Sequence, residues 1–548
     1  MAATNGTFEI SANFVDILDR RIFPARVRGT AGRIEDVTEI NSQPSTFLLP
    51  GFVDSHIHIE SSMLAPPAFA QTAVLHGTVA TVSDPHEIGN VLGVEGVHFM
   101  LDAAEGIPFK FYFGAPSCVP ATAFETAGDS IDSQQVATLL DDPRMVYLRD
   151  MMHCPGVLAG DPAVLKKIEA AKQRNKPVDG HAPGLRGQQA QAYIEAGIST
   201  DHECFTREEA LDKLAAGAKI LIREGSAARN FEALYELIDE YPERCMFCSD
   251  DKHPDELLHG HINQLVQRAI EKGMDRFNVL RAACINPVLH YGLNVGMLRI
   301  GDPADFIEVD NLDQWNILRT YIDGQLVADR GQSFVASGQF EPINKFTAQK
   351  RQVDDFRSPV PDGATEINVI EALDGQLITN PATAVLKKVA GCAVADPERD
   401  LLKLTVVNRY ADTRPALAFI KNFGLKRGAI ASSVAHDSHN VIAVGASDEA
   451  LCAAVNLVIE AKGGLSVVDD EHQQVLPLPI AGLMSDRSCE EVGTSYAALD
   501  RSVKELGCKL RAPFMTLSFM ALLVIPSLKL SDQGLFDGNR FEFISLYR

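Results

Sequence analysis

The stretch FLLPGFVDSHIHIE, residues 47–60, decides the fold because an apolar run ends in polar, chemistry-bearing side chains. Seven similar runs follow: TVATVSD (78–84), FKFYFGAP (109–116), MVYLRDM (145–151), PVDGHA (177–182), STDHEC (199–204), KILIREG (219–225) and RCMFCSDD (244–251). Between them, apolar residues recur three and four positions apart, which is the period of a helix. Apolar strands that alternate with helices indicate a parallel sheet covered on both faces. Eight such units predict an α/β fold with a (β/α)₈ TIM-like barrel.

Polar residues fall at the C-terminal ends of nearly all these runs. They are His56, His58, Asp84, Asp150, His181, His202, Glu203, Glu224, Asp250 and Asp251. A barrel brings the C-terminal ends of its strands to one face, where its active site lies. The barrel and a site at its mouth are therefore predicted by the same pattern.

The residue pattern on both sides of the expected barrel, residues 47–296, differs from the pattern within it. Residues 1–46 and 297–335 read as short strands, and we expect them to form one small β-sandwich domain that flanks the barrel. A polar segment with prolines follows and is typical of a linker. Residues 340–548 mix strand and helix patterns and predict a C-terminal α+β domain.

Composition restricts the partners of the protein. The chain has 548 residues, with 50 basic against 73 acidic side chains and a net charge of −23. Such a field repels nucleic acids and anionic membrane surfaces. The start, MAATNGTFEI, has no pattern of a secretory signal, and the longest apolar stretch, 512–525, is too short to span a bilayer. Ten cysteines without framework spacing are typical of reduced thiols, so we expect a cytoplasmic enzyme.

His56 and His58 form the core of a predicted metal site. Residues two apart on a strand point to the same side, so both imidazoles can reach one ion. His181, His202 and Asp250 end later strands and would converge on the same mouth. Without a cation, these buried imidazoles and the carboxylate would lack hydrogen-bond partners or repel one another. The alternative, core histidines bonded to backbone carbonyls, does not explain their common position.

Longer motifs narrow the prediction to a family. PGFVDSHIHIESS, SDPHEIGNV, DGHAPGL, STDHECFTREEAL, IREGSAARN, SDDKHPDEL, GAIASSVAHDSHNVIAVG and LPLPIAGLMSD together resemble the bacterial adenine deaminases of the amidohydrolase superfamily, over nearly the whole chain. The resemblance implies a site for two divalent metal ions, Mn²⁺ or Fe²⁺, with Zn²⁺ also compatible with nitrogen and oxygen ligands. It implies attack of water on C6 of adenine, which gives hypoxanthine and ammonia.

The resemblance also assigns roles by position. His56, His58, His181, His202 and Asp250 match metal ligands, and Asp250 would also move the proton. Purine N1 needs an acid, for which Glu203, Glu60 and Asp251 are candidates that the sequence does not rank. Two positions depart from the family. Asp150 stands where a metal-bridging glutamate is usual and is shorter by roughly 1.5 Å, and Tyr410 stands where a histidine is usual.

Further residues are candidates for substrate contact. They are Glu60, Asp84, His86, Glu87, Arg223, Glu224, Ser226, Asp251, His436 and His439. For the residues at strand ends the alternative is a network that only stabilises loops. For His436 and His439 the alternatives are closure of the barrel mouth and the ordering of a turn.

Three readings of the function remain open at this point. The first is deamination of adenine or of another 6-aminopurine. In this case the protein binds a small purine base and is expected to be a homodimer. The second is another cyclic-amide hydrolase, although no lysine ends the fourth run, where such enzymes often carry a carboxylated one. The third is an inactive scaffold, which would be expected to lose ligands that this chain keeps.

Overall fold

Eight parallel strands form the centre of the molecule in the computed structural model, which describes residues 7–338 and 340–548. The strands are β5 (Phe52–Ile57), β6 (Thr78–Ser83), β7 (Lys110–Ala115), β8 (Met145–Met151), β9 (Val178–Gly180), β10 (Thr200–Asp201), β11 (Lys219–Arg223) and β12 (Cys245–Cys248). They pair in chain order as β5 to β9 and β10 to β12. The amide of Ser199 donates a hydrogen bond to the carbonyl of Val178 at 2.8 Å, and the amide of Asp250 donates one to the carbonyl of His56 at 2.9 Å. These two bonds join the sheets into a ring.

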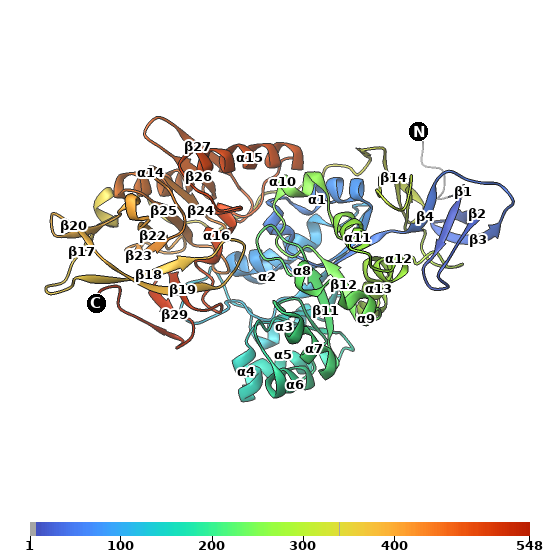
Figure 1. The fold of residues 1–548 in the computed structure, drawn as a ribbon, viewed down its shortest axis with the longest axis horizontal. Coiled ribbons are helices and arrows are strands. Elements are labelled where there is room, and N and C mark those ends of the chain that lie inside the picture. Colours follow the sequence, from blue (N-terminus) through green and yellow to red (C-terminus); the bar gives the residue numbers. More distant parts are fainter. Residues whose placement is uncertain (1–6, 339) are drawn as a thin grey trace.

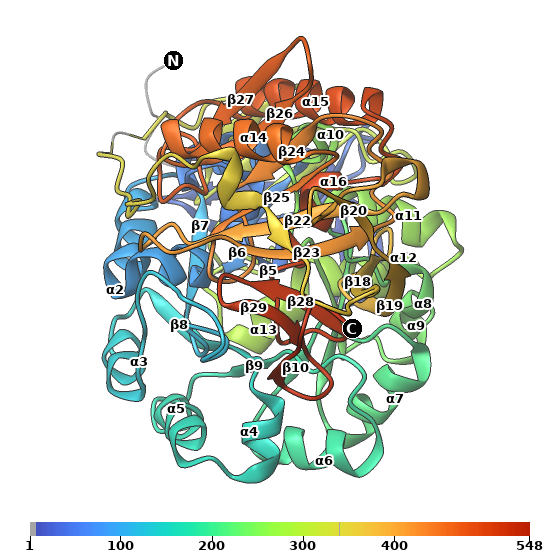
Figure 2. The ribbon, with the colours of Figure 1, turned by 90° about the vertical axis from the view of Figure 1, so that its left-hand side faces the viewer.

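Helices follow the strands and surround the ring (Figure 2). They include α2 (His86–Ala103), α3 (Ser133–Leu139), α4 (Cys154–Ala159), α5 (Pro162–Lys172), α6 (Gly187–Glu195), α7 (Arg207–Ala216), α8 (Phe231–Leu234), α9 (Leu237–Glu240), α11 (Ile262–Glu271), α12 (Arg276–Leu280) and α13 (Asn286–Tyr291). In α7, the Thr206 side chain accepts a hydrogen bond from the amide of Glu209, and Gly217 ends the helix at φ 109°. The predicted alternation of parallel strands and helices is confirmed.

The stretch 47–60 is not one barrel strand, and the expectation of a single strand is wrong. Phe47–Pro50 forms β4, which pairs with β1 (Phe8–Asp16) and β13 (Phe306–Val309) in a separate sheet, and β5 begins at Phe52. Gly51 lies at the change of direction. A Cβ atom there would lie 2.3 Å from Cγ1 of Val79, so the chain passes too close to β6 for any side chain.

Segments from both sides of the barrel share that second sheet, whose order is β16-β15-β14-β13-β4-β1-β2-β3. The remaining strands are β2 (Arg21–Thr30), β3 (Arg33–Glu39), β14 (Ile317–Ile322), β15 (Gln325–Asp329) and β16 (Gln332–Ser333). Figure 1 shows β1 to β4 at the end of the molecule opposite the C-terminus. Residues 1–6 of the expected N-terminal segment lie outside the described residues.

Residues 340–548, here called the C-terminal region, pack against the barrel (Figures 1 and 2). Their main sheet has the order β19-β18-β23-β22-β25-β24-β26-β27. Its strands are β18 (Glu366–Ala372), β19 (Thr379–Val385), β22 (Leu402–Val407), β23 (Ala416–Lys421), β24 (Ala429–Ser432), β25 (Val441–Gly445), β26 (Gly464–Val468) and β27 (Gln473–Pro477).

Helices connect this region to the barrel. α14 (Asp448–Glu460) covers β24 to β26, while α15 (Cys489–Glu505) packs against α10 (Pro254–His259) of the barrel. The amide of Ser485 bonds the carbonyl of Met63 at 2.8 Å across the same boundary. α16 (Pro513–Phe519) packs against β24 and β25. Within the described part of the chain, no helix has the length and apolarity needed to cross a membrane.

Candidate active site

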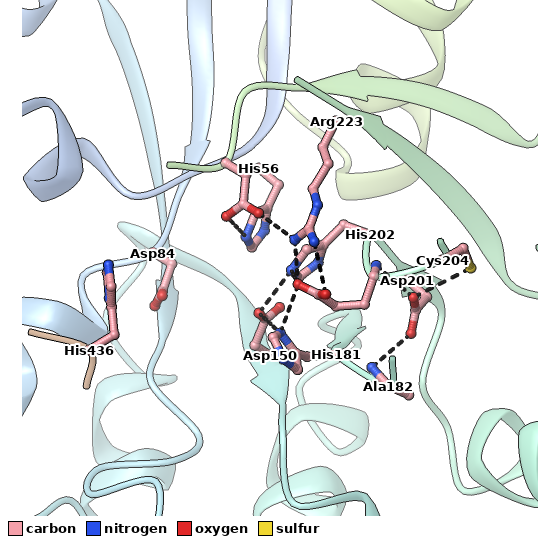
Figure 3. Close-up of polar contacts among 12 residues, drawn as sticks. His56, Asp84, Asp150, His181, Ala182, Asp201, His202, Cys204, Arg223 and His436 are labelled. Atoms are coloured by element: carbon pink, nitrogen blue, oxygen red, sulfur yellow. Dashed lines mark hydrogen bonds and ion pairs between the residues drawn. The ribbon is translucent and has the colours of Figure 1, made fainter. Parts of the chain in front are cut away.

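Four predicted histidines meet at the C-terminal ends of the barrel strands, and Figure 3 shows three of them, His56, His181 and His202. His56 and His58 lie at the end of β5, His181 follows β9 and His202 follows β10. The rings of His56 and His202 stack with centroids 4.1 Å apart, and those of His181 and His202 are 5.3 Å apart. All four side chains are buried. The strand-end pattern thus locates the cluster correctly.

Two carboxylates complete the cluster. Asp150 Oδ2, on β8, lies 3.4 Å from Nδ1 of His181 and 3.5 Å from Nε2 of His202. Asp250 Oδ1, just after β12, lies 3.3 Å from Nε2 of His58 and 3.7 Å from Nε2 of His56. Asp150 reaches the histidines although its side chain is shorter than that of glutamate.

The donor set fits divalent cations. His56, His58 and Asp250 place ligand atoms within 4.8 Å of one another, and so do the sets His56–Asp150–His202 and His181–His202–Glu203. Nδ1 of His56, Nε2 of His181 and Oδ1 of Asp150 are buried and make no hydrogen bond to any described residue. Buried polar atoms without partners are costly, and nitrogen and oxygen donors suit Mn²⁺, Fe²⁺ and Zn²⁺. The residues present can therefore hold a divalent metal.

Two buried arginines also enter the cluster. Arg223 ion-pairs with Glu203 and with Oδ2 of Asp250, the latter at 2.6 Å. Arg149 Nη2 lies 2.9 Å from Nε2 of His56 and 2.5 Å from Nε2 of His58. Arg149 was not among the predicted site residues, because successive strand residues normally face opposite sides and Asp150 was expected to face the mouth. The pairing of β8 with β9 is irregular between Leu148 and Met151, which brings both side chains to the mouth.

Arg223 and burial shift the pKa values of the carboxylates in opposite directions. Burial opposes ionisation, but the Arg223 guanidinium holds the pKa values of Glu203 and Asp250 well below their ordinary range. Burial and the neighbouring Asp250 charge raise the pKa of Asp251. Burial and Asp84 raise the pKa of Glu60 to about 8.

The C-terminal region supplies another wall of the site. His436 lies in the loop between β24 and β25, and its Nδ1 is 2.7 Å from Oε1 of Glu87 at the start of α2. Nε2 of His439 contacts the other oxygen of Glu87. The His436 ring stacks on Phe519, with centroids 4.9 Å apart. Tyr410 donates a hydrogen bond to the carbonyl of Ser438 at 2.7 Å and so supports this loop.

These groups surround a cavity of about 30 Å³. Its lining includes His58, His86, Glu87, Asp150, His181, His202, Glu203, Arg149, Arg223, Asp250, Asp251, His436, Asp437, Leu377, Phe519 and Leu522. Glu60, Asp84 and His439 are buried among these groups without lining the cavity.

Glu224 and Ser226 are not brought to this cavity, which corrects their placement as substrate contacts. Glu224 ion-pairs with Arg268 at 2.7 Å, and Ser226 donates a hydrogen bond to Glu256. Glu224 follows Arg223 on the chain, and because Arg223 points to the mouth, its neighbour points away from it.

The ring of parallel strands, with a histidine–carboxylate cluster at its mouth that can hold divalent metal, defines a hydrolase of the amidohydrolase class. Residues 47–327 match the amidohydrolase family, and residues 376–542 match the adenine deaminase C-terminal domain.

Whole-chain relatives narrow the class further. The chain is 55% identical to an adenine deaminase of Salinibacter ruber, over 99% of each chain. It is also 55% identical to one of Sulfurovum sp., over 98% of this chain and 100% of the relative, and 52% identical to one of Methanosarcina acetivorans, over 97% and 98%. The chain belongs to the adenine deaminase family.

Proposed function

We propose that this protein hydrolyses adenine to hypoxanthine and ammonia at the cavity of the barrel mouth. One water molecule is consumed, its oxygen replaces the amino group at C6, and the amine leaves as ammonia. The observation that carries the proposal is the convergence of His58, His181 and His202 with Asp150 and Asp250 on one cavity, with His56 in the same metal-binding groups, in a chain of this family.

The metal ligands we propose are His56, His58, Asp150, His181, His202 and Asp250. The family resemblance implies two ions, Mn²⁺ or Fe²⁺ before Zn²⁺. When bound, a divalent cation lowers the pKa of a water molecule toward neutrality and polarises the bond under attack.

We assign the proton transfer to Asp250. Its carboxylate lies at the histidine cluster and lines the cavity, and ion-pairing to Arg223 keeps it ionised and ready to accept a proton from the attacking water. The same group then returns the proton to the leaving amine. Arg223 therefore acts as a positioning residue for Asp250.

The ring nitrogen needs a separate proton donor, for which we favour Asp251 over Glu203. Both line the cavity, whereas Glu60 does not. Glu203 binds Arg223 with both of its oxygens, so it is engaged as an ion-pair partner. Asp251 accepts one hydrogen bond from Ser61 Oγ, at 2.5 Å, and has an oxygen left for the purine.

Binding of a purine requires movement of the cavity wall. A volume of about 30 Å³ corresponds to about one water molecule. Leu377, Phe519 and Leu522 of the C-terminal region line the cavity and are apolar. We propose that they move away to admit the base and then cover its faces, while His86, Glu87 and His436 contact its edge.

The larger organisation is part of the same proposal. We propose a β-sandwich domain of residues 1–46 with 297–335, a barrel domain of residues 47–296 and an α+β domain of residues 340–548. We also propose that the protein works as a homodimer in the cytoplasm. The sheet shared by β1–β4 and β13–β16 supports the first of these divisions.

The test is ammonia release from adenine by protein loaded with Mn²⁺, with hypoxanthine identified by its absorbance. Turnover of adenine, with none of cytosine or guanine, is the expected result. If the metal-loaded protein acts on N6-substituted adenines or on a cyclic amide instead, adenine is not its substrate. A loaded protein without any of these activities would favour the inactive scaffold.

A control variant separates loss of the site from general damage. His472→Ala changes a histidine whose side chain is 69% exposed and pairs only locally with Asp469. This variant should release ammonia at the wild-type rate, whereas His202→Ala should not. Equal rates in both variants would contradict the assignment of the reaction to the barrel mouth.

A further inference from the structure

The Arg149 guanidinium lies where one metal ion would bind. His56, His58 and Asp250 form one of the metal-binding groups of the mouth, with Oδ1 of Asp250 3.7 Å from Nε2 of His56 and 3.3 Å from Nε2 of His58. Arg149 Nη2 hydrogen-bonds both of these imidazole nitrogens, at 2.9 and 2.5 Å. A ligand nitrogen that accepts a hydrogen bond from the guanidinium cannot direct the same lone pair at a metal, so the two cations exclude each other there.

Ion pairs hold the guanidinium in this position. Its Nε lies 2.7 Å from Oδ2 of Asp84, and its Nη1 lies 2.7 Å from Oδ2 of Asp150. The side chain is only 3% exposed. An arginine keeps its charge at any pH, and removal of a buried cation from two carboxylates is strongly unfavourable. Arg149 is therefore a fixed part of the site.

A different set of donors retains the spacing of a metal site. Asp150 Oδ2 is 3.4 Å from Nδ1 of His181 and 3.5 Å from Nε2 of His202. Ligands at about 2.1 Å from one tetrahedral ion are about 3.4 Å apart. The imidazoles of His181 and His202 each lie within 3.5 Å of Glu203 Oε1 as well. Asp150 Oδ2 also pairs with Arg149, but a carboxylate oxygen has a second lone pair and Oδ1 of Asp150 has no hydrogen-bond partner among the described residues. This second group can therefore hold an ion while Arg149 remains at His56 and His58.

We propose that Arg149 is a built-in cation that replaces one of the two metal ions, so that this protein binds a single divalent ion at Asp150, His181 and His202. The guanidinium then donates hydrogen bonds to His56 and His58 and ion-pairs with Asp84 and Asp150. The inference narrows the two-ion, six-ligand assignment of the proposed function to one ion, and it rests on that function only in that the single ion would serve the proposed deamination.

Metal counting tests the proposal directly. Wild-type protein is saturated with Mn²⁺, freed of loosely bound ion by gel filtration and analysed by mass spectrometry of the metal, and the same sample is examined by electron paramagnetic resonance. We expect about one ion per chain with the spectrum of an isolated Mn²⁺. In Arg149→Ala we expect about two ions and the spectrum of an exchange-coupled pair, because two-metal sites hold their ions about 3.5–4 Å apart.

Arg149→Lys is the matched control. It keeps a positive charge near His56 and His58 and should remain at about one ion per chain. Circular dichroism and the melting temperature establish that both variants are folded. Two ions, or none, in the wild-type protein would overturn the proposal whether or not the variants fold. A folded Arg149→Ala protein that still binds one ion would overturn it too.

The same samples distinguish this inference from the proposed function. Ammonia release from adenine is measured in parallel with the metal count. Wild-type protein with one ion and no activity on adenine would contradict the proposed substrate and leave the role of Arg149 standing. An active wild-type protein with a coupled pair of ions would contradict the role of Arg149 alone.

Discussion

Nδ1 of His436, in the C-terminal region, lies 2.7 Å from Oε1 of Glu87, in the barrel. Burial opposes protonation, but the Glu87 carboxylate and Asp251 raise the pKa of His436 to about 9. The pair is therefore charged at neutral pH and connects two parts of the chain that are 349 positions apart by residue number. Both residues line the cavity, so this contact joins the C-terminal region to the barrel at the wall of the site.

Replacement of His436 should weaken substrate binding. A hydrogen bond to a charged group contributes about 1.5–3 kcal/mol, so His436→Ala should raise KM for adenine by roughly 10- to 100-fold. Steady-state kinetics with adenine checks this, with His472→Ala as the exposed control. Unchanged KM and kcat in a folded His436→Ala protein would show that the histidine only orders its loop.

Asp250 and Asp251 should differ in their effect on catalysis. Asp250→Asn removes the group that we propose to move the proton, and kcat should fall by about 10² or more. Asp251→Asn should also lower kcat, since the amide cannot protonate the ring, while metal content stays unchanged. Single-turnover rates and metal analysis on each variant check both statements. A near-normal rate in Asp250→Asn would assign the proton transfer to Asp251 or Glu203.

Asp150 should control metal content. Its Oδ2 atom lies 3.4 and 3.5 Å from the ligand nitrogens of His181 and His202. Asp150→Glu keeps a carboxylate and should keep the metal, whereas Asp150→Ala should lose about one equivalent per chain. Metal analysis after dialysis measures this. An alanine variant with the metal content of the wild-type protein would remove Asp150 from the site.

Lys213 should stabilise the strand ends that carry His181 and His202. Its ammonium lies 2.9 Å from Glu209 and 3.1 Å from Asp201, and it donates a hydrogen bond to the carbonyl of Ala182 at 2.6 Å. Lys213→Met leaves two buried carboxylates without their partner and should lower the free energy of unfolding by about 3–5 kcal/mol.

Lys272→Met is the control for Lys213. It removes an exposed ion pair with Glu232 and should cost no more than about 1 kcal/mol. Urea unfolding at neutral pH compares the two variants. Equal losses would mean that the buried network around Lys213 adds nothing beyond a surface pair.

Local pattern was enough to predict most of the barrel and its histidines. Strand period and the repeated polar ends placed His56, His181 and His202 correctly, because parallel strands bring their ends to one face. The same reasoning failed at Gly51, where the chain leaves one sheet for another. It failed because a close approach to Val79 is a tertiary contact that no local pattern carries.

Arg149 shows the other limit of sequence reasoning. Strand alternation predicts that neighbouring residues face opposite sides, and this rule correctly turns Glu224 away from Arg223. The irregular pairing of β8 with β9 suspends the rule at Arg149 and Asp150. The sequence MVYLRDM contains no signal for that irregularity, so a central cation of the site was missed.

The buried Lys529 should make stability depend on pH. Burial lowers the pKa of its ammonium to about 7, and its Nζ donates hydrogen bonds to the carbonyls of Leu377 and Phe519 at 2.6 and 2.8 Å. In the unfolded chain lysine titrates near 10.4, so between about pH 7 and pH 10 the unfolded state binds more protons than the folded state. The free energy of unfolding therefore rises with pH across this window, and the gain is lost as pH falls toward 7. From pH 7 to pH 9 the Lys529 contribution should amount to about 2 kcal/mol.

Lys529→Met removes this titration, so the difference in stability between wild type and variant should grow in favour of the wild type by that amount. Urea unfolding at both pH values measures it, with Lys350→Met, at an exposed lysine, as the control. A difference between wild type and Lys529→Met that stays constant from pH 7 to pH 9 would contradict a neutral Lys529 in the folded protein.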